Sequence, residues 1–169
     1  NVICLNGNPF FNWYGKLECL SPNFIYEDDV LFNKDKSKII SCRVQGIRSY
    51  IIPSSVTSIG NYAFDGCDFL SDIVIPDSVT SIGNRAFAYC KSLRSVVIPD
   101  SVTNIDAWAF SDCESLRSVV ISDGVTSIGE SAFSGCSSLS DIVIPDSVTS
   151  IGIGAFFICS SLSNIVIPD

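Results

Sequence analysis

The chain is 169 residues long and 47% hydrophobic, which is enough for one continuous core. Its formal net charge is −8, and it contains no histidine, which excludes Ser-His-Asp triads, Cys-His pairs and every metal site that needs an imidazole. No apolar run approaches the roughly 18 residues required to cross a bilayer, so we expect no membrane insertion by this segment.

The charge is unevenly distributed along the chain. Residues 1–52 contain 6 Lys/Arg and 5 Asp/Glu, whereas residues 53–169 contain 4 and 13. Nucleic acids are bound mainly through Lys and Arg contacts to phosphates, so the acidic second part predicts no nucleic-acid partner. The absence of methionine predicts an exported and processed piece whose first residue is not the initiator.

The first 23 residues are predicted to be the irregular part of an N-terminal capping region, residues 1–52. A turn is predicted at residues 6–9, followed by an aromatic cluster at residues 10–14. We interpret these aromatics as a cover over the open first coil; the alternative is a stacking surface for a sugar or peptide. Cys4 and Cys19 are a candidate disulfide, with two reduced thiols as the alternative.

Residues 24–49 are predicted to form β-hairpins. The strand-like runs 24–26 and 30–32 are separated by an acidic turn, and a second polar turn at residues 33–36 precedes Ile39-Ile40. A hairpin cap is expected here because the first repeat of an array otherwise presents unpaired backbone groups and bare apolar side chains.

A 23-residue pattern then repeats without insertions to the end of the chain. Its five copies occupy residues 53–75, 76–98, 99–121, 122–144 and 145–167, and Pro168-Asp169 begins a sixth. Repetition at this period indicates a solenoid, because one unit cannot bury its apolar side chains alone. We expect a right-handed, β-rich α/β solenoid with parallel strands and short helical or 3₁₀ turns.

The second repeat shows the expected roles of its segments. Residues 72–75 have the β-branched content of a strand, and residues 79–82 form a second extended piece that crosses back. Gly83 belongs to a glycine column, Gly60, Gly83, Gly129 and Gly152, in which Asp106 is the exception. Glycine and Asp tolerate a left-handed backbone, so a left-handed turn is expected there. One helical or 3₁₀ turn is predicted at residues 84–90.

Two columns of residues are expected to fill the core and act structurally. The first is Phe64, Phe87, Phe110, Phe133 and Phe156, and the second is Cys67, Cys90, Cys113, Cys136 and Cys159. We interpret the cysteines as small buried thiols, because no Cys-x-x-Cys pair suggests zinc.

The pattern Ile-Pro-x-x-Val-Thr-x-Ile-Gly-x-x-Ala-Phe-x-x-Cys-x-x-Leu over residues 50–169 resembles the BspA-type, or treponemal, leucine-rich repeat. The resemblance implies a leucine-rich-repeat superhelix in a secreted or cell-surface protein of a host-associated microbe. Several members of that family are adhesins for host matrix, plasma or microbial proteins. It implies no catalytic residues and no cofactor.

The candidate protein-binding face is the outer face of the parallel sheet. Its apolar column is Val74, Val97, Val120, Val143 and Val166, and its polar column is Asp72, Ser95, Ser118, Asp141 and Asn164. The family often has Thr where this chain has the valines. Stacked exposed valines mark a partner surface, although β-branched side chains also stabilise their neighbours in a ladder.

A third column contains the aspartates that follow the strands: Asp77, Asp100, Asp123, Asp146 and Asp169. We interpret them as turn residues that bond nearby amides, with weak calcium bridging as the alternative. No metal site is therefore assigned.

The sequence as a whole predicts a non-enzymatic recognition module that binds a host or microbial protein at a cell surface. The alternative is a structural spacer that presents another domain of a longer surface protein. The exposed C-terminal coil also predicts end-to-end self-association.

Overall fold

The computed structural model describes residues 2, 4–5, 7–10, 13, 15–43 and 46–167, and these contain thirteen strands and no helix. The expected Pro168-Asp169 start of a sixth repeat lies outside the described residues. The strands are β1 Phe24–Glu27, β2 Val30–Asn33, β3 Lys38–Cys42, β4 Ser49–Ile51, β5 Ser58–Ile59, β6 Asp72–Val74, β7 Ser81–Ile82, β8 Ser95–Ile98, β9 Asn104–Ile105, β10 Ser118–Ile121, β11 Ser127–Ile128, β12 Asp141–Ile142 and β13 Ser150–Ile151.

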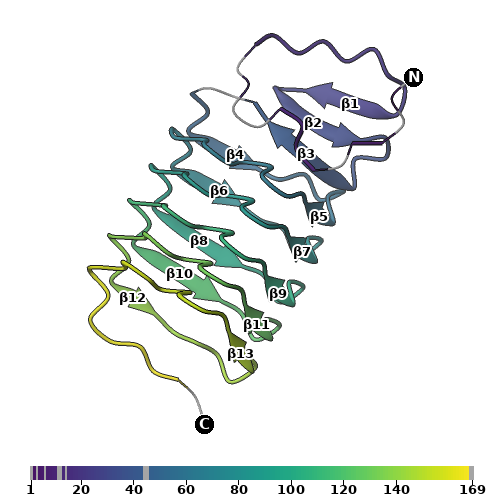
Figure 1. Cartoon of the computed structure of the whole chain (residues 1–169). Helices are drawn as coiled ribbons and strands as arrows, with labels where there is room; N and C mark the ends of the chain where they lie inside the picture. The colour runs from purple at the N-terminus through teal and green to yellow at the C-terminus, as the bar shows by residue number, and fades with distance from the viewer. Residues whose placement is uncertain are drawn as a thin grey trace.

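From residue 49 onward the chain is a β-solenoid in which each 23-residue repeat forms one coil (Figure 1). The even-numbered strands β4 to β12 lie along one side of the stack, and the odd-numbered strands β5 to β13 lie along the other. Neighbouring coils pair in parallel at equivalent positions; for example, Val120 is the partner of Val97. The predicted 23-residue coils with parallel strands are therefore confirmed.

The two rows of strands differ in continuity. The even row is divided into a two-stranded sheet, β4–β6, and a three-stranded sheet, β8–β10–β12. The odd-numbered strands β5 to β13 belong to one eight-stranded sheet, whose first three strands are β1, β2 and β3. Within it, β1–β2 and β2–β3 are antiparallel, and β3 pairs in parallel with β5 through Ile39 and Ile59.

The helical or 3₁₀ turn predicted at residues 84–90 is not found. The backbone amides of this segment alternate between two kinds of acceptor. Those of Ala86 and Cys90 bond the carbonyl three residues back, whereas those of Arg85 and Phe87 bond the carbonyls of Ala107 and Ala109 in the next coil. A helix needs successive amides to bond within the segment, so the stacking of coils displaces it.

The expectation of a left-handed turn at the glycine column is wrong. A Cβ atom at Gly83 would lie 2.8 Å from the Asn61 nitrogen and 2.9 Å from the Gly60 carbonyl carbon, so glycine is needed there for close approach of two coils. Positive φ angles occur instead two and six residues later, in two columns: Tyr62, Arg85, Trp108, Ser131 and Gly154, and Gly66, Tyr89, Asp112, Gly135 and Ile158.

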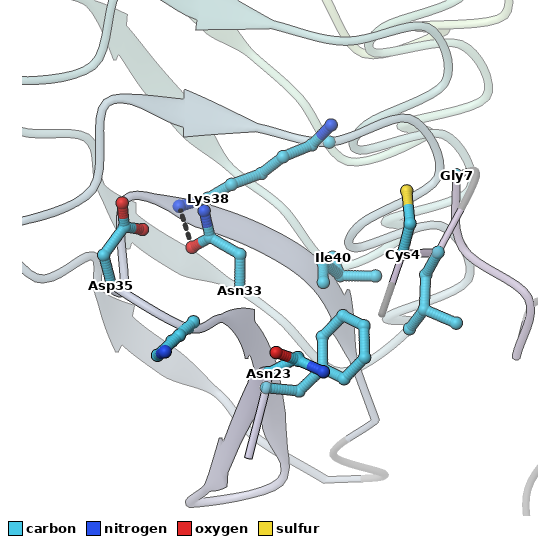
Figure 2. A pocket seen from close by; sticks show the side chains of 11 residues that line it. Cys4, Gly7, Asn23, Asn33, Asp35, Lys38 and Ile40 are labelled. Atoms are coloured by element: carbon cyan, nitrogen blue, oxygen red, sulfur yellow. Dashed lines mark hydrogen bonds between the residues drawn. The ribbon is translucent and has the colours of Figure 1, made fainter. Parts of the chain in front are cut away.

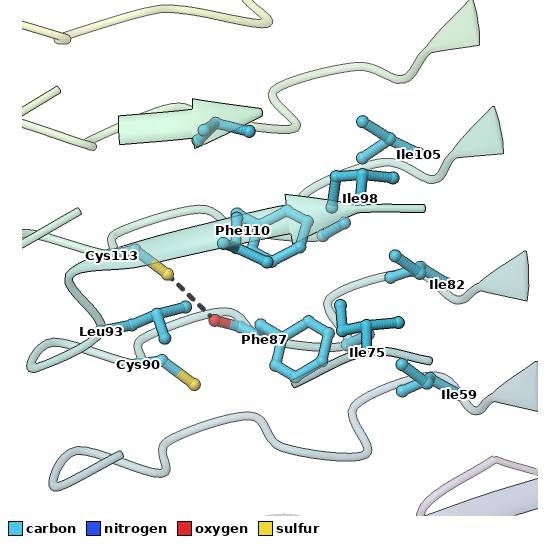
Figure 3. Close-up of a cluster of buried hydrophobic side chains, with 14 of the residues drawn as sticks. Ile59, Ile75, Ile82, Phe87, Cys90, Leu93, Ile98, Ile105, Phe110 and Cys113 are labelled. Carbon is cyan, nitrogen blue, oxygen red and sulfur yellow. Dashed lines mark hydrogen bonds between the residues drawn. The ribbon is translucent and has the colours of Figure 1, made fainter. Parts of the chain in front are cut away.

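The phenylalanine side chains form one continuous stack through the core, of which Figure 3 shows Phe87 and Phe110. Successive ring centroids from Phe64 to Phe156 are 5.0, 5.1, 5.4 and 5.7 Å apart, and the interplanar angles fall from 14° to 3°. The first four rings are fully buried, and Phe156 is partly buried. Equal-length coils therefore bring identical side chains into contact.

The cysteine column lies beside this stack and has a role that its sequence pattern does not reveal. The thiol of Cys113 donates a hydrogen bond to the Phe87 carbonyl oxygen of the preceding coil at 3.2 Å (Figure 3), and three further cysteines do the same at 3.1 or 3.2 Å. Burial raises the pKa of the Cys90 and Cys113 thiols. Both remain protonated and serve as small core donors rather than nucleophiles.

Candidate functional site

Five outward valines on the side of the even-numbered strands form a regular, exposed apolar feature. Their exposed fractions are 54% for Val74, 56% for Val97, 51% for Val120, 77% for Val143 and 66% for Val166. Their inward neighbours Val96 and Val119 are only 2% and 5% exposed. Because successive side chains of a strand point to opposite faces, the strands both complete the core and present an apolar row to solvent. We call this row the valine row.

The strand ladder does not join every member of the valine row. Val97 and Val120 are direct partners on β8 and β10, and Val74 is paired with Ile51. Val143 follows the short strand β12, and Val166 lies outside any strand. Within the valine row, Val97 and Val120 are therefore the two members that are paired directly with each other, at the centre of the row over β8 and β10.

The predicted polar column runs beside the valine row, and all five of its residues are exposed: Asp72, Ser95, Ser118, Asp141 and Asn164. Two of its carboxylates accept hydrogen bonds from the preceding residue: Ser71 to Asp72 at 2.5 Å and Ser140 to Asp141 at 2.8 Å. The remaining members leave hydroxyl and amide groups beside the valines.

Arginines also border this face, and the sequence analysis did not single them out. The polar-column residues Ser95 and Ser118 are immediately preceded by Arg94 and Arg117. Ser49, the equivalent residue one coil before Asp72, is preceded by Arg48. All three arginines are exposed. Their 23-residue spacing, interrupted by Ser71, is the pattern that would have identified them.

The outer face of the odd-numbered strands offers less for a partner. The Thr80 hydroxyl donates to the Thr57 carbonyl at 3.1 Å, and the Ser81 hydroxyl donates to Ser58 at 2.9 Å. Thr126 repeats this bond one coil after Thr103, also at 3.1 Å. The hydroxyl groups of these side chains donate hydrogen bonds to the adjacent coil.

A cavity of about 610 Å³ lies at the N-terminal end, between the first residues and the hairpin strands (Figure 2). Cys4 and Gly7 line one wall, and Asn33, Asp35 and Lys38 line the other. Two of its polar groups already have partners: Asn33 Oδ1 accepts from the Lys38 amide at 2.8 Å, and Asp35 accepts from the Ser37 hydroxyl at 2.7 Å. The lining suggests a local packing role rather than a ligand site.

The N-terminal aromatics contact a cation. The Arg43 guanidinium lies 5.3 Å from the ring centroid of Phe10 and 4.3 Å from that of Trp13, and it donates to the Gly15 carbonyl at 2.6 Å. Phe11 and Tyr14, the other aromatics of the predicted cluster, lie outside the described residues. The cover over the first coil remains a prediction.

The candidate Cys4–Cys19 disulfide is not formed, and both residues are thiols. Cys19 is placed 3.9 Å from the Ser21 carbonyl and 4.0 Å from that of Phe24, to which its thiol donates weak hydrogen bonds.

The aspartate column is exposed at Asp77, Asp100, Asp123 and Asp146, and its fifth member, Asp169, is not among the described residues. Within the part of the chain that the structure describes, no three His, Cys, Asp or Glu side chains are close enough to share a metal ion. No helix there is long and apolar enough to cross a membrane.

A stacked trio lies on the turn side of the coils, where Arg85 lies between two aromatic rings. Its guanidinium is 6.0 Å from the Tyr62 ring centroid and 5.4 Å from that of Trp108. All three residues adopt the left-handed backbone conformation, with φ angles of 53° to 59°. Trp108 is partly buried against its neighbour, which accounts for it as a packing residue.

Asp65 lies next to this trio, and burial makes its ionised carboxylate unfavourable. Its Oδ2 atom is buried and receives no hydrogen bond among the described residues. Burial raises the pKa of Asp65 from 3.8 to about 6, and the Arg85 guanidinium partly opposes the shift. Because the folded pKa is above the unfolded value, the ionised carboxylate destabilises the fold above about pH 6, and the penalty disappears as the pH falls toward 3.8.

We therefore expect Asp65→Ala to stabilise the protein at pH 7.5. Ala88 occupies the equivalent position of the next coil and is fully buried, so the smaller side chain fits the fold. After allowance for solvent screening, the free energy of unfolding is expected to rise by about 1 kcal/mol at pH 7.5 and by less at pH 4. Urea unfolding at both pH values measures it, with the exposed Asp68→Ala as control. An equal gain at the two pH values would show that the charge is not the cause.

Comparison with family models finds a BspA type leucine-rich repeat region of 6 copies over residues 41–163. The chain belongs to the BspA-type leucine-rich repeat family. The family identification agrees with the repeat pattern and with the parallel coils described above. No curated protein sequence gives a significant match.

Solved structures of bacterial leucine-rich repeat proteins have the same fold. The Treponema pallidum leucine-rich repeat protein is 33% identical with a TM-score of 0.75, and the match covers 90% of this chain and 72% of that protein. The pneumococcal vaccine antigen PcpA is 25% identical with a TM-score of 0.75 (85% and 36% covered). A leucine-rich cell surface protein of Faecalibacterium prausnitzii is 28% identical with a TM-score of 0.56 (86% and 54% covered). This BspA-type chain thus spans only about a third to a half of two of these relatives.

Proposed function

We propose that this chain is a non-enzymatic protein-binding module at a cell surface or in secretions, and that it adheres to a host or microbial protein through the face of the even-numbered strands. The observation that carries the proposal is the valine row, whose members are 51 to 77% exposed while the alternate strand residues Val96 and Val119 are buried. Contiguous exposed apolar rows often mark surfaces that a partner covers.

The comparisons support the location and the general role. Leucine-rich repeat solenoids are typically non-enzymatic interaction folds, and one structural relative is described as a cell surface protein and another as a vaccine antigen. The cell-surface location of the Faecalibacterium prausnitzii protein supports a partner from outside the cell as the molecule that covers the sheet face.

A charge placed on the valine row tests the proposal. We expect Val97→Lys/Val120→Lys/Val143→Lys to lower partner capture at least tenfold, because a buried unpaired ammonium is strongly disfavoured in an apolar contact. The measurement is capture from host plasma, matrix extract and microbial surface extract by immobilised protein. All three valines are exposed, so the melting temperature should change little.

The matched control places three lysines on the opposite sheet face, as Ser81→Lys/Asn104→Lys/Ser127→Lys, and its melting temperature is also measured because the Ser81 and Ser127 hydroxyls bond adjacent coils. A partner retained by this control and lost by the valine variant supports the proposal. A partner retained equally by both variants would remove the sheet face from consideration. If the wild type captures nothing from any source, the chain is better described as a structural spacer in a longer surface protein.

We also propose that the last coil takes part in end-to-end self-association. Ile153, Phe157 and Ile158 are 86%, 63% and 61% exposed there. A molecular mass that rises with concentration in light scattering would support this, and a constant mass would refute it.

A further inference from the structure

On the sheet face, the two central coils carry positive charge before their strands and negative charge after them. Arg94 and Arg117 precede β8 and β10, and Asp100 and Asp123 follow these strands. All four charged side chains are exposed. The ion pairs among the described residues join Lys36 to Glu27 and Lys91 to Glu114, so neither arginine is neutralised by a neighbouring carboxylate.

The charged residues form parallel edges with the valines between them. Val97 and Val120 are direct cross-strand partners, and Ser95 is paired with Ser118, so equivalent residues of the two coils lie side by side. Neighbouring strands are about 4.8 Å apart, and a residue advances about 3.3 Å along a strand. The basic and acidic edges, six residues apart in sequence, are therefore separated by at most about 20 Å.

These dimensions match those of an α-helix lying across the strands. A helix is about 10–12 Å wide with its side chains and rises about 5.4 Å per turn, so each turn meets about one coil. Its apolar stripe would cover the valines while long charged side chains on its flanks reach both edges. An extended segment is too narrow to contact the two edges at once.

Carboxylates limit the basic edge at both ends. The positions equivalent to the arginines are Ser71 one coil before Arg94 and Ser140 one coil after Arg117, and each is followed in the chain by an exposed carboxylate, Asp72 or Asp141. An acidic run longer than about two helical turns would meet these carboxylates and be repelled. This order of charges, a carboxylate, two arginines and a carboxylate, favours one register for a short acidic segment on the face.

On this basis we propose that the partner presents an amphipathic helix with an apolar stripe, a short acidic flank over Arg94 and Arg117, and a basic flank over Asp100 and Asp123. This inference depends on the proposed function, because it names the kind of protein surface that the valine row contacts. Electrostatic complementarity mainly determines partner choice and register, whereas the apolar contact supplies most of the area.

The test uses two synthetic helical peptides with the same leucine stripe. The first has Glu on one flank over two turns and Lys on the other, and the second has Lys on both flanks. Binding to the full chain is measured by fluorescence anisotropy at 150 mM salt. We expect the wild type to bind the Glu/Lys peptide about tenfold more tightly than the Lys/Lys peptide.

Reversing the basic edge should reverse this preference. The Arg94→Glu/Arg117→Glu variant is expected to bind the Lys/Lys peptide more tightly, and Arg94→Ser/Arg117→Ser, which copies Ser71 and Ser140 of adjacent coils, should abolish the preference. A wild type that favours the Lys/Lys peptide, or a preference that survives both substitutions, overturns the inference.

A third variant separates this inference from the proposed function. If Val97→Lys/Val120→Lys loses both peptides while the arginine variants behave like the wild type, the sheet face binds but the charge order does not matter. If the valine variant binds both peptides as the wild type does, the sheet face is not the site, and both proposals fail.

Discussion

Phe110→Ala is expected to lower the free energy of unfolding by about 4 kcal/mol, which is the usual range for removing a fully buried ring. Phe110 is completely buried and stacks on rings at both sides, with centroids 5.1 Å from Phe87 and 5.4 Å from Phe133. In a solenoid each coil contacts only its neighbours, so the cavity also weakens both interfaces of the central coil. Urea unfolding followed by circular dichroism measures the loss.

Phe156→Ala provides the matched control within the same column. Phe156 is partly buried and stacks on Phe133 alone, at 5.7 Å. Removing it should cost about half as much, because less apolar area and one ring contact are lost. Equal losses at Phe110 and Phe156 would mean that the stack does not stabilise the array in the way its geometry indicates.

Removing residues 1–42 is expected to abolish cooperative unfolding and cause aggregation. Val30, Phe32 and Ile39 belong to the same buried core as Ile59 and Phe64, and β3 is the strand that pairs with β5. Without them the first coil exposes both its apolar side chains and an unpaired strand edge. The expected result is a concentration-dependent rise in light scattering and a broad unfolding transition.

A shorter truncation controls for the loss of chain length. Removing residues 1–22 leaves β1, β2 and β3 in place, so the transition should stay cooperative and the protein monodisperse. If the two truncations behave alike, the hairpin strands are not a cap. Stability retained after removal of all 42 residues would have the same meaning.

The repeat period predicted the interior and the direction of the strand side chains. A fixed 23-residue spacing in equal-length coils stacks like residues, so the Phe64 to Phe156 column could be read from the sequence. The outward position of Val97 and Val120 followed from alternation along a strand, in which each is flanked by buried residues. These inferences depended only on period and side-chain chemistry.

Features set by contacts between coils could not be predicted in the same way. The glycine at position 83 suggested a left-handed turn, whereas its role is to admit the backbone of the preceding coil. The left-handed positions are held by Tyr62, Arg85 and Trp108, side chains that give no sequence cue for that conformation. Likewise, nothing in residues 24–42 indicated that β3 extends the odd-numbered sheet rather than the even-numbered one.

The most direct measurement of the central claim is methyl NMR of the valines during titration with the captured partner. The chain contains its own reference, because Val79, Val102 and Val125 are fully buried in the same coils as the exposed valines. Binding at the sheet face predicts large shift changes for Val74, Val97, Val120 and Val143 and small ones for the buried valines. Unchanged signals from these four valines, with changes confined to the N-terminal hairpins or to the turns that carry Arg85, would contradict it.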